Sequence, residues 1–211
     1  MPKVLPDGIE LSLQPLTGAE EEDRSIAAAV SDRYHTLLLG KEATETAFKE
    51  LVETHNIIHL ATHGIAYTEA PLQSFVALSP SETESGEIEN GLLTAKEVAQ
   101  NRSLSADLIV LSACQTGLGR ISGDGMLGLS RAFLIAGART VVVSQWSVSD
   151  SATKELMVAF YKHYLEHGNK AIALQQAMQQ VRDGLRLGKP TQLEYSHPPY
   201  WAAFVLVGAE I

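Results

Sequence analysis

The stretch Asp107–Gly117, DLIVLSACQTG, joins a run of apolar residues to a turn that carries the chain's only cysteine, Cys114. A second apolar run, Asn56–Gly64 or NIIHLATHG, ends in the same way, with His63 before a glycine. Short apolar runs bounded by turn residues are typical of buried parallel strands. The 51 positions from His63 to Cys114 leave room for the crossover that two neighbouring parallel strands require. If the two strands are neighbours, an imidazole and a thiol lie at the same edge of one sheet.

Such an edge would supply what a cysteine nucleophile needs. A histidine takes the thiol proton, and backbone N–H groups of the following turns hold an oxyanion. Ligand crevices in open α/β sheets also form at the carboxyl ends of strands. Against this stands the ordinary role of a free cysteine, which is to fill the core as a small apolar side chain. The residues alone leave both interpretations of Cys114 open.

Helical and apolar strand-like segments alternate along the chain, which predicts a layered α/β domain with a mostly parallel sheet. Thr94 and Glu97 have the T-x-x-E spacing of a capping box at the start of a short helix. Longer helices are expected at 19–30, 44–54, 125–136, 151–167 and 170–187. Strands are expected at 35–39, 57–62, 75–78, 107–113, 140–145 and 201–207.

The composition narrows the class of protein. A chain of 211 residues can bury one sizeable core, and it has no apolar run as long as the roughly 18 residues of a membrane helix. The net charge of −9 repels phosphate backbones and anionic lipid, so direct binding of nucleic acid or of a membrane is not expected. The acidic stretches 20–23 and 82–89 are interpreted as solvated faces and a loop. A lone cysteine and a first segment without an apolar signal core fit a reducing cytoplasm.

Other motifs are weaker. Gly123–Gly128, GDGMLG, matches the G-x-G-x-x-G pattern of dinucleotide sites but lies about nine residues after the preceding strand, so a nucleotide-binding oxidoreductase would rest on this pattern alone. His55, His59 and His63 recur every four residues, but four residues of a strand span about 13 Å, so His59 and His63 cannot share one zinc ion. His59 is expected to be a hydrogen-bonded core residue. No G-x-S-x-G motif of a serine hydrolase is present.

Two aspartates stand near the predicted site. Asp124 follows the cysteine turn, and Asp150 follows the strand at 140–145 and precedes a helix. N-capping of that helix is the simplest role for Asp150. Both are also candidates to line a pocket that binds a basic substrate side chain through charge-assisted hydrogen bonds. The large apolar side chains near the site are expected in the core: Trp146, Trp201 and Phe204.

Four segments resemble the CHAT domain family, a caspase-like family related to the separases: HLATHG at 59–64, LSACQTGLG at 111–119, GDGMLGLSRAFLIAGARTVVVSQWSVSD at 123–150 and HPPYWAAFVLVG at 197–208. The likeness extends from about Leu16 to Gly208, and the motifs occur in the family's order. The resemblance implies a three-layer α/β/α caspase-like sandwich with a mostly parallel central sheet.

The resemblance also implies an activity. His63 and Cys114 fall on the family's protease dyad, so a cysteine peptidase is implied, acting as a regulated effector in a signalling or defence pathway. The N–H groups of Gly64 and Cys114 are expected to hold the oxyanion, and no metal or organic cofactor is implied. The expected partners are a protein or peptide substrate and a helical-repeat sensor of the tetratricopeptide type.

The start of the chain departs from the family pattern. In the family, a central strand precedes the segment that matches residues 16–29, but residues 1–15 are rich in proline and glycine and lack a five-residue apolar run. They are interpreted as an extension or a remnant of an upstream region, and 16–211 as the CHAT-like domain. The isolated chain is then expected to be inactive or poorly folded until a strand completes it. The alternative function is a non-catalytic signalling or scaffold module that keeps the fold.

Overall fold

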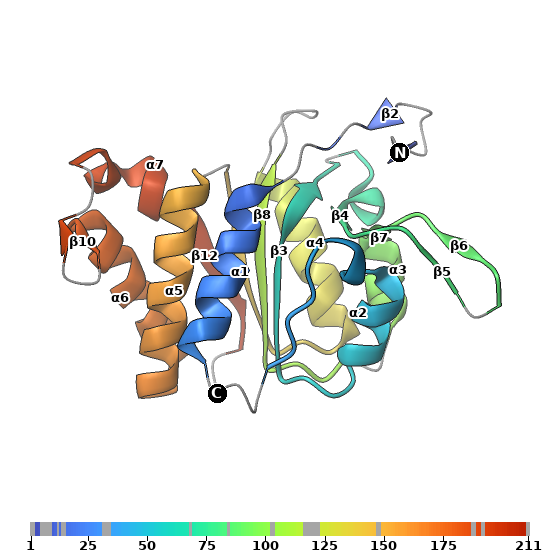
Figure 1. Cartoon of the computed structure of the whole chain (residues 1–211), viewed down its shortest axis with the longest axis horizontal. Helices are drawn as coiled ribbons and strands as arrows, with labels where there is room; N and C mark the ends of the chain where they lie inside the picture. Colours follow the sequence, from blue (N-terminus) through green and yellow to red (C-terminus); the bar gives the residue numbers. More distant parts are fainter. Residues whose placement is uncertain are drawn as a thin grey trace.

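A computed structural model describes residues 3–4, 10–11, 13, 16–30, 35–67, 69–83, 85–101, 104–115, 123–146, 149–186, 189–190 and 193–209. Within these ranges the chain forms a three-layer α/β/α sandwich, in which one six-stranded sheet lies between two layers of helices (Figure 1). The fold class expected from the sequence is confirmed.

The central sheet has the strand order β12-β9-β8-β3-β4-β7. β9, β8 and β3 pair in parallel, whereas β12 on one side and β4 and β7 on the other pair antiparallel. The strands are β3 (Ile57–Ile65), β4 (Phe75–Ala77), β7 (Leu92–Thr94), β8 (Leu108–Gln115), β9 (Thr140–Ser144) and β12 (Phe204–Gly208). The predicted parallel pairing therefore holds at the centre of the sheet, where the buried apolar runs lie.

Helices cover both faces of this sheet. The α-helices are α1 (Thr17–Ala29), α2 (Glu45–Leu51), α3 (Ala95–Gln100), α4 (Gly123–Ala136), α5 (Asp150–His167), α6 (Lys170–Arg182) and α7 (Pro198–Trp201). Helices α1, α5 and α6 pack on one face, and α2, α3 and α4 on the other. Among the helices that the structure describes, none combines the length and apolarity of a membrane span.

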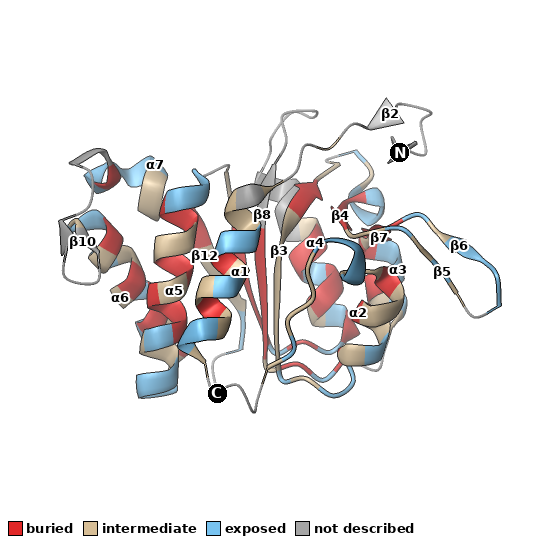
Figure 2. Ribbon diagram, in the orientation of Figure 1, coloured by how far each residue is buried: buried red, intermediate tan, exposed pale blue. Residues whose placement is uncertain are grey.

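Each face of the sheet has its own core, and β8 contributes to both. Leu108 and Val110 belong to the core under α1, α5 and α6, whereas Ile109 and Leu111 belong to the core under α2, α3 and α4. All four side chains are completely buried. Because successive side chains of a strand point to opposite faces, a strand covered on both faces needs an unbroken apolar run. Figure 2 shows the buried residues following the sheet and the inner sides of both helical layers.

The helix caps test two predictions. The Thr94 hydroxyl accepts from the Glu97 N–H and the Glu97 carboxylate accepts from the Thr94 N–H, which confirms the capping box of α3. At α5 the Ser149 hydroxyl accepts from the Ala152 N–H, so the predicted N-cap role of Asp150 is wrong. Asp150 is the first helical residue, where a carboxylate interacts favourably with the positive end of the helix dipole.

Two predicted elements differ in the structure. Residues 35–39, a leucine-rich run expected to be a strand, join no ladder and lead into the 3₁₀ turn Gly40–Glu42. Helix α6 ends at Arg182 rather than near residue 187, since Gly184 follows in the left-handed region with φ of 72°. The chain then enters the two-stranded hairpin of β10 (Leu185–Arg186) and β11 (Lys189–Pro190).

The last strand starts later than predicted. A short helix with prolines at its first positions, α7, occupies the expected start, and β12 begins at Phe204. Phe204 is buried as expected. Trp146 and Trp201 are only partly buried, and each donates its indole N–H to a main-chain carbonyl, that of Pro199 and of Ser196 respectively.

One side of β3 is largely unpaired. The strand meets β4 only through Gly64 and Ile65, while β1 (Lys3–Val4) and β2 (Glu10–Leu11) pair with each other. On the side away from β8, Ile57–Thr62 have no ladder partner among the described strands, and we call this stretch the open edge of β3. Cavities of about 430 Å³ and 130 Å³ lie along it, and the residues that line both include Leu38, Ala43, His59 and Leu60.

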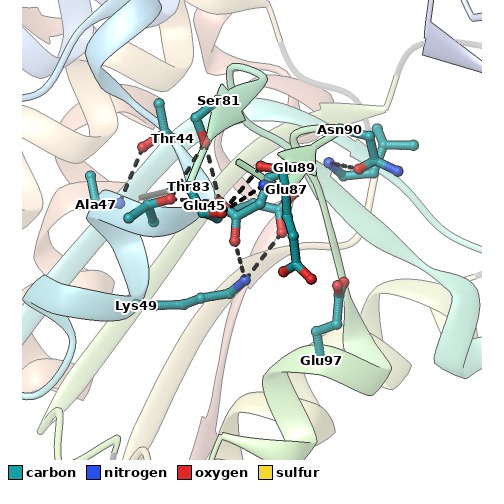
Figure 3. Close-up of polar contacts among 12 residues, drawn as sticks. Thr44, Glu45, Ala47, Lys49, Ser81, Thr83, Glu87, Glu89, Asn90 and Glu97 are labelled. Atoms are coloured by element: carbon teal, nitrogen blue, oxygen red, sulfur yellow. Dashed lines mark hydrogen bonds and ion pairs between the residues drawn. The ribbon is translucent and has the colours of Figure 1, made fainter. Parts of the chain in front are cut away.

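The acidic stretch expected to be a loop contains a hairpin that projects from the body of the domain (Figure 1). Its strands are β5 (Ser81–Glu82) and β6 (Ile88–Glu89), and its base rests on α2 (Figure 3). The hydroxyls of Thr46 and Ser81 both donate to the Glu89 carboxylate, at 2.7 and 3.2 Å. The hairpin is therefore anchored at its base, whereas Ile88 is 82% exposed.

A lysine joins two carboxylates at this base. Lys49 Nζ lies 2.7 Å from Glu89 Oε1 and 3.5 Å from Glu45 Oε2 (Figure 3). Burial raises the pKa of Glu45, the nearby Glu97 carboxylate raises it further, and Lys49 opposes both effects. The lysine thus connects the buried carboxyl of α2 to the hairpin.

Candidate active site

The two strands that carry the histidine and the cysteine are neighbours. β3 and β8 pair in parallel with His63 opposite Cys114 and Gly64 opposite Gln115. This confirms the predicted adjacency of the two apolar runs, whose backbones are about 4.8 Å apart in such a pair. The pairing is a property of the main chain, so it does not depend on a loop conformation.

His63 lies beside the larger cavity of the open edge. Its side chain is 6% exposed, and it stands four residues after His59 on the same face of β3. That face is covered by α1, which contributes Glu20 and Asp23 to the lining of the 430 Å³ cavity that His63 also lines. The His63 imidazole therefore lines a cavity that is also lined by two carboxylates.

The glycine after His63 lies inside the sheet. Gly64 is opposite Gln115 of β8 and opposite Val76 of β4. The roles expected for the Gly64 and Cys114 N–H groups at an oxyanion stay predictions, as do the roles of the His63 and Cys114 side chains.

The two candidate pocket aspartates lie at the starts of helices. Asp124 is the second residue of α4, and its side chain falls outside the described part of the chain. Asp150 lines a small cavity with Ser112 and Thr153, distinct from the one beside His63. A Cβ atom on Gly18 would overlap the Asp150 side chain, so α1 approaches α5 closely because residue 18 is glycine. A substrate-binding role for Asp124 and Asp150 stays a prediction.

His59 is held in a buried polar chain. Its Nε2 lies 2.9 Å from Glu22 Oε1, and its Nδ1 lies 3.1 Å from the Tyr161 hydroxyl. This confirms the expected hydrogen-bonded core histidine. Glu22 is only 3% exposed, so the interpretation of the whole acidic stretch 20–23 as a solvated face is wrong at this residue. Burial, together with the Glu22 and Asp23 carboxylates, raises the pKa of Tyr161 well above its usual value.

Asp23 is the site residue that sequence reasoning missed. Its Oδ1 lies 3.9 Å from His59 Nε2, and burial raises its pKa to about 6, opposed by His59 and reinforced by Glu22. Its position could have been found from helix periodicity, because Ala19, Glu22 or Asp23, and Ile26 recur at the spacing of one helix face. That stripe faces β3.

The glycine pattern is part of a helix. Gly123–Gly128 has helical backbone within α4, so it does not form a strand-to-helix turn around a pyrophosphate. A Cβ on Gly128 would lie 3.1 Å from the Pro71 Cβ, so this glycine allows a close contact between α4 and the 3₁₀ turn Pro71–Gln73. Packing thus accounts for Gly128, the last glycine of the pattern.

Comparison with known proteins agrees with the motifs. The sequence model of the CHAT domain family matches residues 6–209 of this chain. Tetratricopeptide repeat protein 28 of Mus musculus is 38% identical over 120 residues, covering 57% of this chain and 4% of the relative. The Homo sapiens protein of the same name is 28% identical over 225 residues, covering 93% of this chain and 9% of the relative. The chain thus spans less than a tenth of the length of these relatives. It belongs to the CHAT domain family, whose fold is related to that of the caspase-like peptidases.

Proposed function

We propose that this domain is a cysteine peptidase in which Cys114 is the nucleophile and His63 the general base. The observation that carries the proposal is the register of β3 and β8, which pairs His63 with Cys114. Residues paired on neighbouring parallel strands share a face of the sheet, so an imidazole and a thiol at these positions can exchange a proton. Membership of the CHAT family supports the same chemistry.

The reaction follows from these roles. His63 takes the thiol proton, and the Cys114 sulfur attacks the scissile carbonyl carbon, while N–H groups of Gly64 and Cys114 stabilise the oxyanion. The C–N bond breaks as His63 returns the proton to the leaving amine, which leaves a thioester. Water, deprotonated by His63, then attacks the thioester and releases the acid and the thiol.

The reactivity of the lone thiol tests this proposal. Because Cys114 is the only cysteine, iodoacetamide alkylation of the native chain reports on it alone. We expect its rate constant near neutral pH to fall about tenfold in His63→Ala, because a neighbouring imidazole favours the thiolate. His197→Ala, which removes an exposed histidine, is the matched control and should not change the rate. A native rate equal to that of the urea-unfolded chain, or one insensitive to His63, would rule out the dyad.

We further propose that the substrate presents a basic side chain before the cleaved bond. The acidic residues that support this are Glu20 and Asp23 on the cavity wall, together with Asp124 and Asp150 at helix starts of the same sheet edge. Profiling a peptide library should show preference for Arg or Lys, reduced in Asp124→Asn or Asp150→Asn and unchanged in Asp183→Asn, an exposed aspartate elsewhere. Equal cleavage of basic and apolar peptides by the native chain contradicts the preference.

The second candidate function is a non-catalytic signalling or scaffold module. It is favoured by the open edge of β3, which offers main-chain groups to a partner. The relatives are named for tetratricopeptide repeats, so a helical-repeat region is the partner that we propose for either function. Slow, His63-independent alkylation of a cooperatively folded chain would select this function over the peptidase.

A further inference from the structure

Three metal-ligating side chains gather on the last turn of α5. His163, Glu166 and His167 stand at positions i, i+3 and i+4, which lie on one side of a helix. One ligand atom from each lies within 4.8 Å of the others. His163 Nδ1 is 3.8 Å and His167 Nε2 is 3.9 Å from Glu166 Oε2. The two rings are nearly parallel, with centroids 6.3 Å apart.

A hydrogen bond to the neighbouring helix sets the tautomer of His163. Its Nε2 lies 3.3 Å from Gln180 Oε1 of α6, and an amide oxygen only accepts, so Nε2 carries the hydrogen. The Nδ1 lone pair is then presented toward Glu166. This nitrogen is buried and has no hydrogen-bond partner among the described residues.

The Nδ1 lone pair of His163 and the Glu166 carboxylate therefore face each other, at 3.8 Å. Buried polar atoms in folded proteins are almost always satisfied, and the described side chains give this nitrogen no hydrogen-bond partner. A proton on Nδ1 would satisfy this one pair, whereas a divalent cation would satisfy all three donors. The negative end of the α5 dipole, at its C-cap Gly168, also favours a cation here.

The donor set selects the kind of cation. Two imidazole nitrogens and one carboxylate oxygen suit zinc, while magnesium and calcium prefer oxygen alone. Ligands at about 2.1 Å in a tetrahedron are roughly 3.4 Å apart, closer than the 3.8 and 3.9 Å to the Glu166 oxygen and than the 4.8 Å within which all three atoms lie. Small rotations of side chains on the helix surface close that difference. Gln180 would orient the His163 ring through its hydrogen bond to Nε2, as hydrogen-bond partners of zinc-bound histidines do.

We propose that His163, Glu166 and His167 form a zinc site, with water as the fourth ligand, at the C-terminal end of α5. The site is separate from the candidate active site. α5 begins at the carboxyl end of β9. At a rise of 1.5 Å per residue, His163 lies about 20 Å further along the helix, toward the opposite end of the strands (Figure 1).

Titration of the full chain with Zn²⁺ alone, followed by calorimetry and by thermal melting, tests the site. We expect one saturable site per chain and a rise in melting temperature, as for any ligand that binds only the folded state. Cys114→Ser should retain the binding, which separates this site from the thiol. His167→Gln should weaken it at least tenfold, and His197→Gln, the matched control on another exposed histidine, should not.

The supporting glutamine gives a second readout. Gln180→Leu removes the acceptor for His163 Nε2 without touching a ligand, and binding should weaken about 10- to 100-fold. Co²⁺ in place of Zn²⁺ should give the visible absorption of a tetrahedral site, lost in His167→Gln. Absence of saturable binding, or binding that survives His167→Gln and disappears in Cys114→Ser, would overturn the proposal.

Discussion

Asp23→Asn is expected to raise the free energy of unfolding by up to about 3 kcal/mol at pH 7.5, since each unit of pKa shift corresponds to 1.36 kcal/mol. Burial of this carboxyl on the inner face of α1 raises its pKa from 3.8 to about 6. Its side chain is 19% exposed, so water screens little of the cost of its charge. Asparagine keeps the shape of the side chain and removes that charge.

The pH dependence gives the sign of the effect. Between about pH 4 and 6 the folded chain binds the Asp23 proton more tightly than the unfolded chain, so stability falls as the pH rises through this window. The gain from Asp23→Asn should therefore be small at pH 4 and complete above about pH 7. Urea unfolding at both pH values measures it.

A matched control lies on the same helix. Glu20→Gln replaces a carboxylate that is 55% exposed and paired with Arg24, and its effect should stay within about 1 kcal/mol at either pH. If Asp23→Asn instead lowers the stability at pH 7.5, the prediction is wrong, because the attraction of the ionised carboxylate to His59 then outweighs the cost of its burial.

An extended peptide laid along the open edge of β3 is expected to stabilise the domain by about 2 kcal/mol, or roughly 5 °C in melting temperature. Ile57–Thr62 have a ladder on the β8 side only, among the described strands. A strand added there would pair with their outward N–H and C=O groups and fill the two cavities beside them. The peptidase activity proposed above should increase with it, because the same strand carries His63.

The experiment compares two tethered peptides. A six-residue strand alternating valine and threonine, joined to the N-terminus by a glycine-serine linker, should raise the melting temperature and the alkylation rate of Cys114. The same peptide with proline at alternate positions cannot donate to a ladder and should do neither. Equal melting of the two fusions, together with slow amide exchange along Ile57–Thr62, would show that the edge is already covered.

The parts of the site that were predictable from sequence are those set by uninterrupted apolar runs. NIIHLATHG and DLIVLSACQTG identify their strands because each is buried on both faces, and their similar exits put His63 and Cys114 at one edge. The leucines at 37–39 look the same in sequence but join no ladder. A pattern of apolar side chains indicates that a segment is buried. It does not indicate that the segment pairs in a sheet, because pairing depends on another strand elsewhere in the chain.

Polar residues were harder to place, for a related reason. Ser149 and Asp150 are both favourable N-cap residues. The residue at which helical backbone begins decides between them, and that residue is Asp150. Glu22 looks solvated in the run EEED, yet its partner His59 is 37 residues away. Helix periodicity can place Glu22 on the inner face of α1, but whether a charge is tolerated there depends on that distant partner.

The hairpin of β5 and β6 offers an entry point for protein engineering. Ser81 and Glu89 are ladder partners, so the chain leaves and returns at one place on the surface, and the base is fixed to α2 by Lys49. A whole domain inserted at the tip would add mainly loop-closure entropy, which grows only with the logarithm of the inserted length. A fluorescent reporter or an affinity module could thus be carried at this tip while the pairing of β3 with β8 stays as it is.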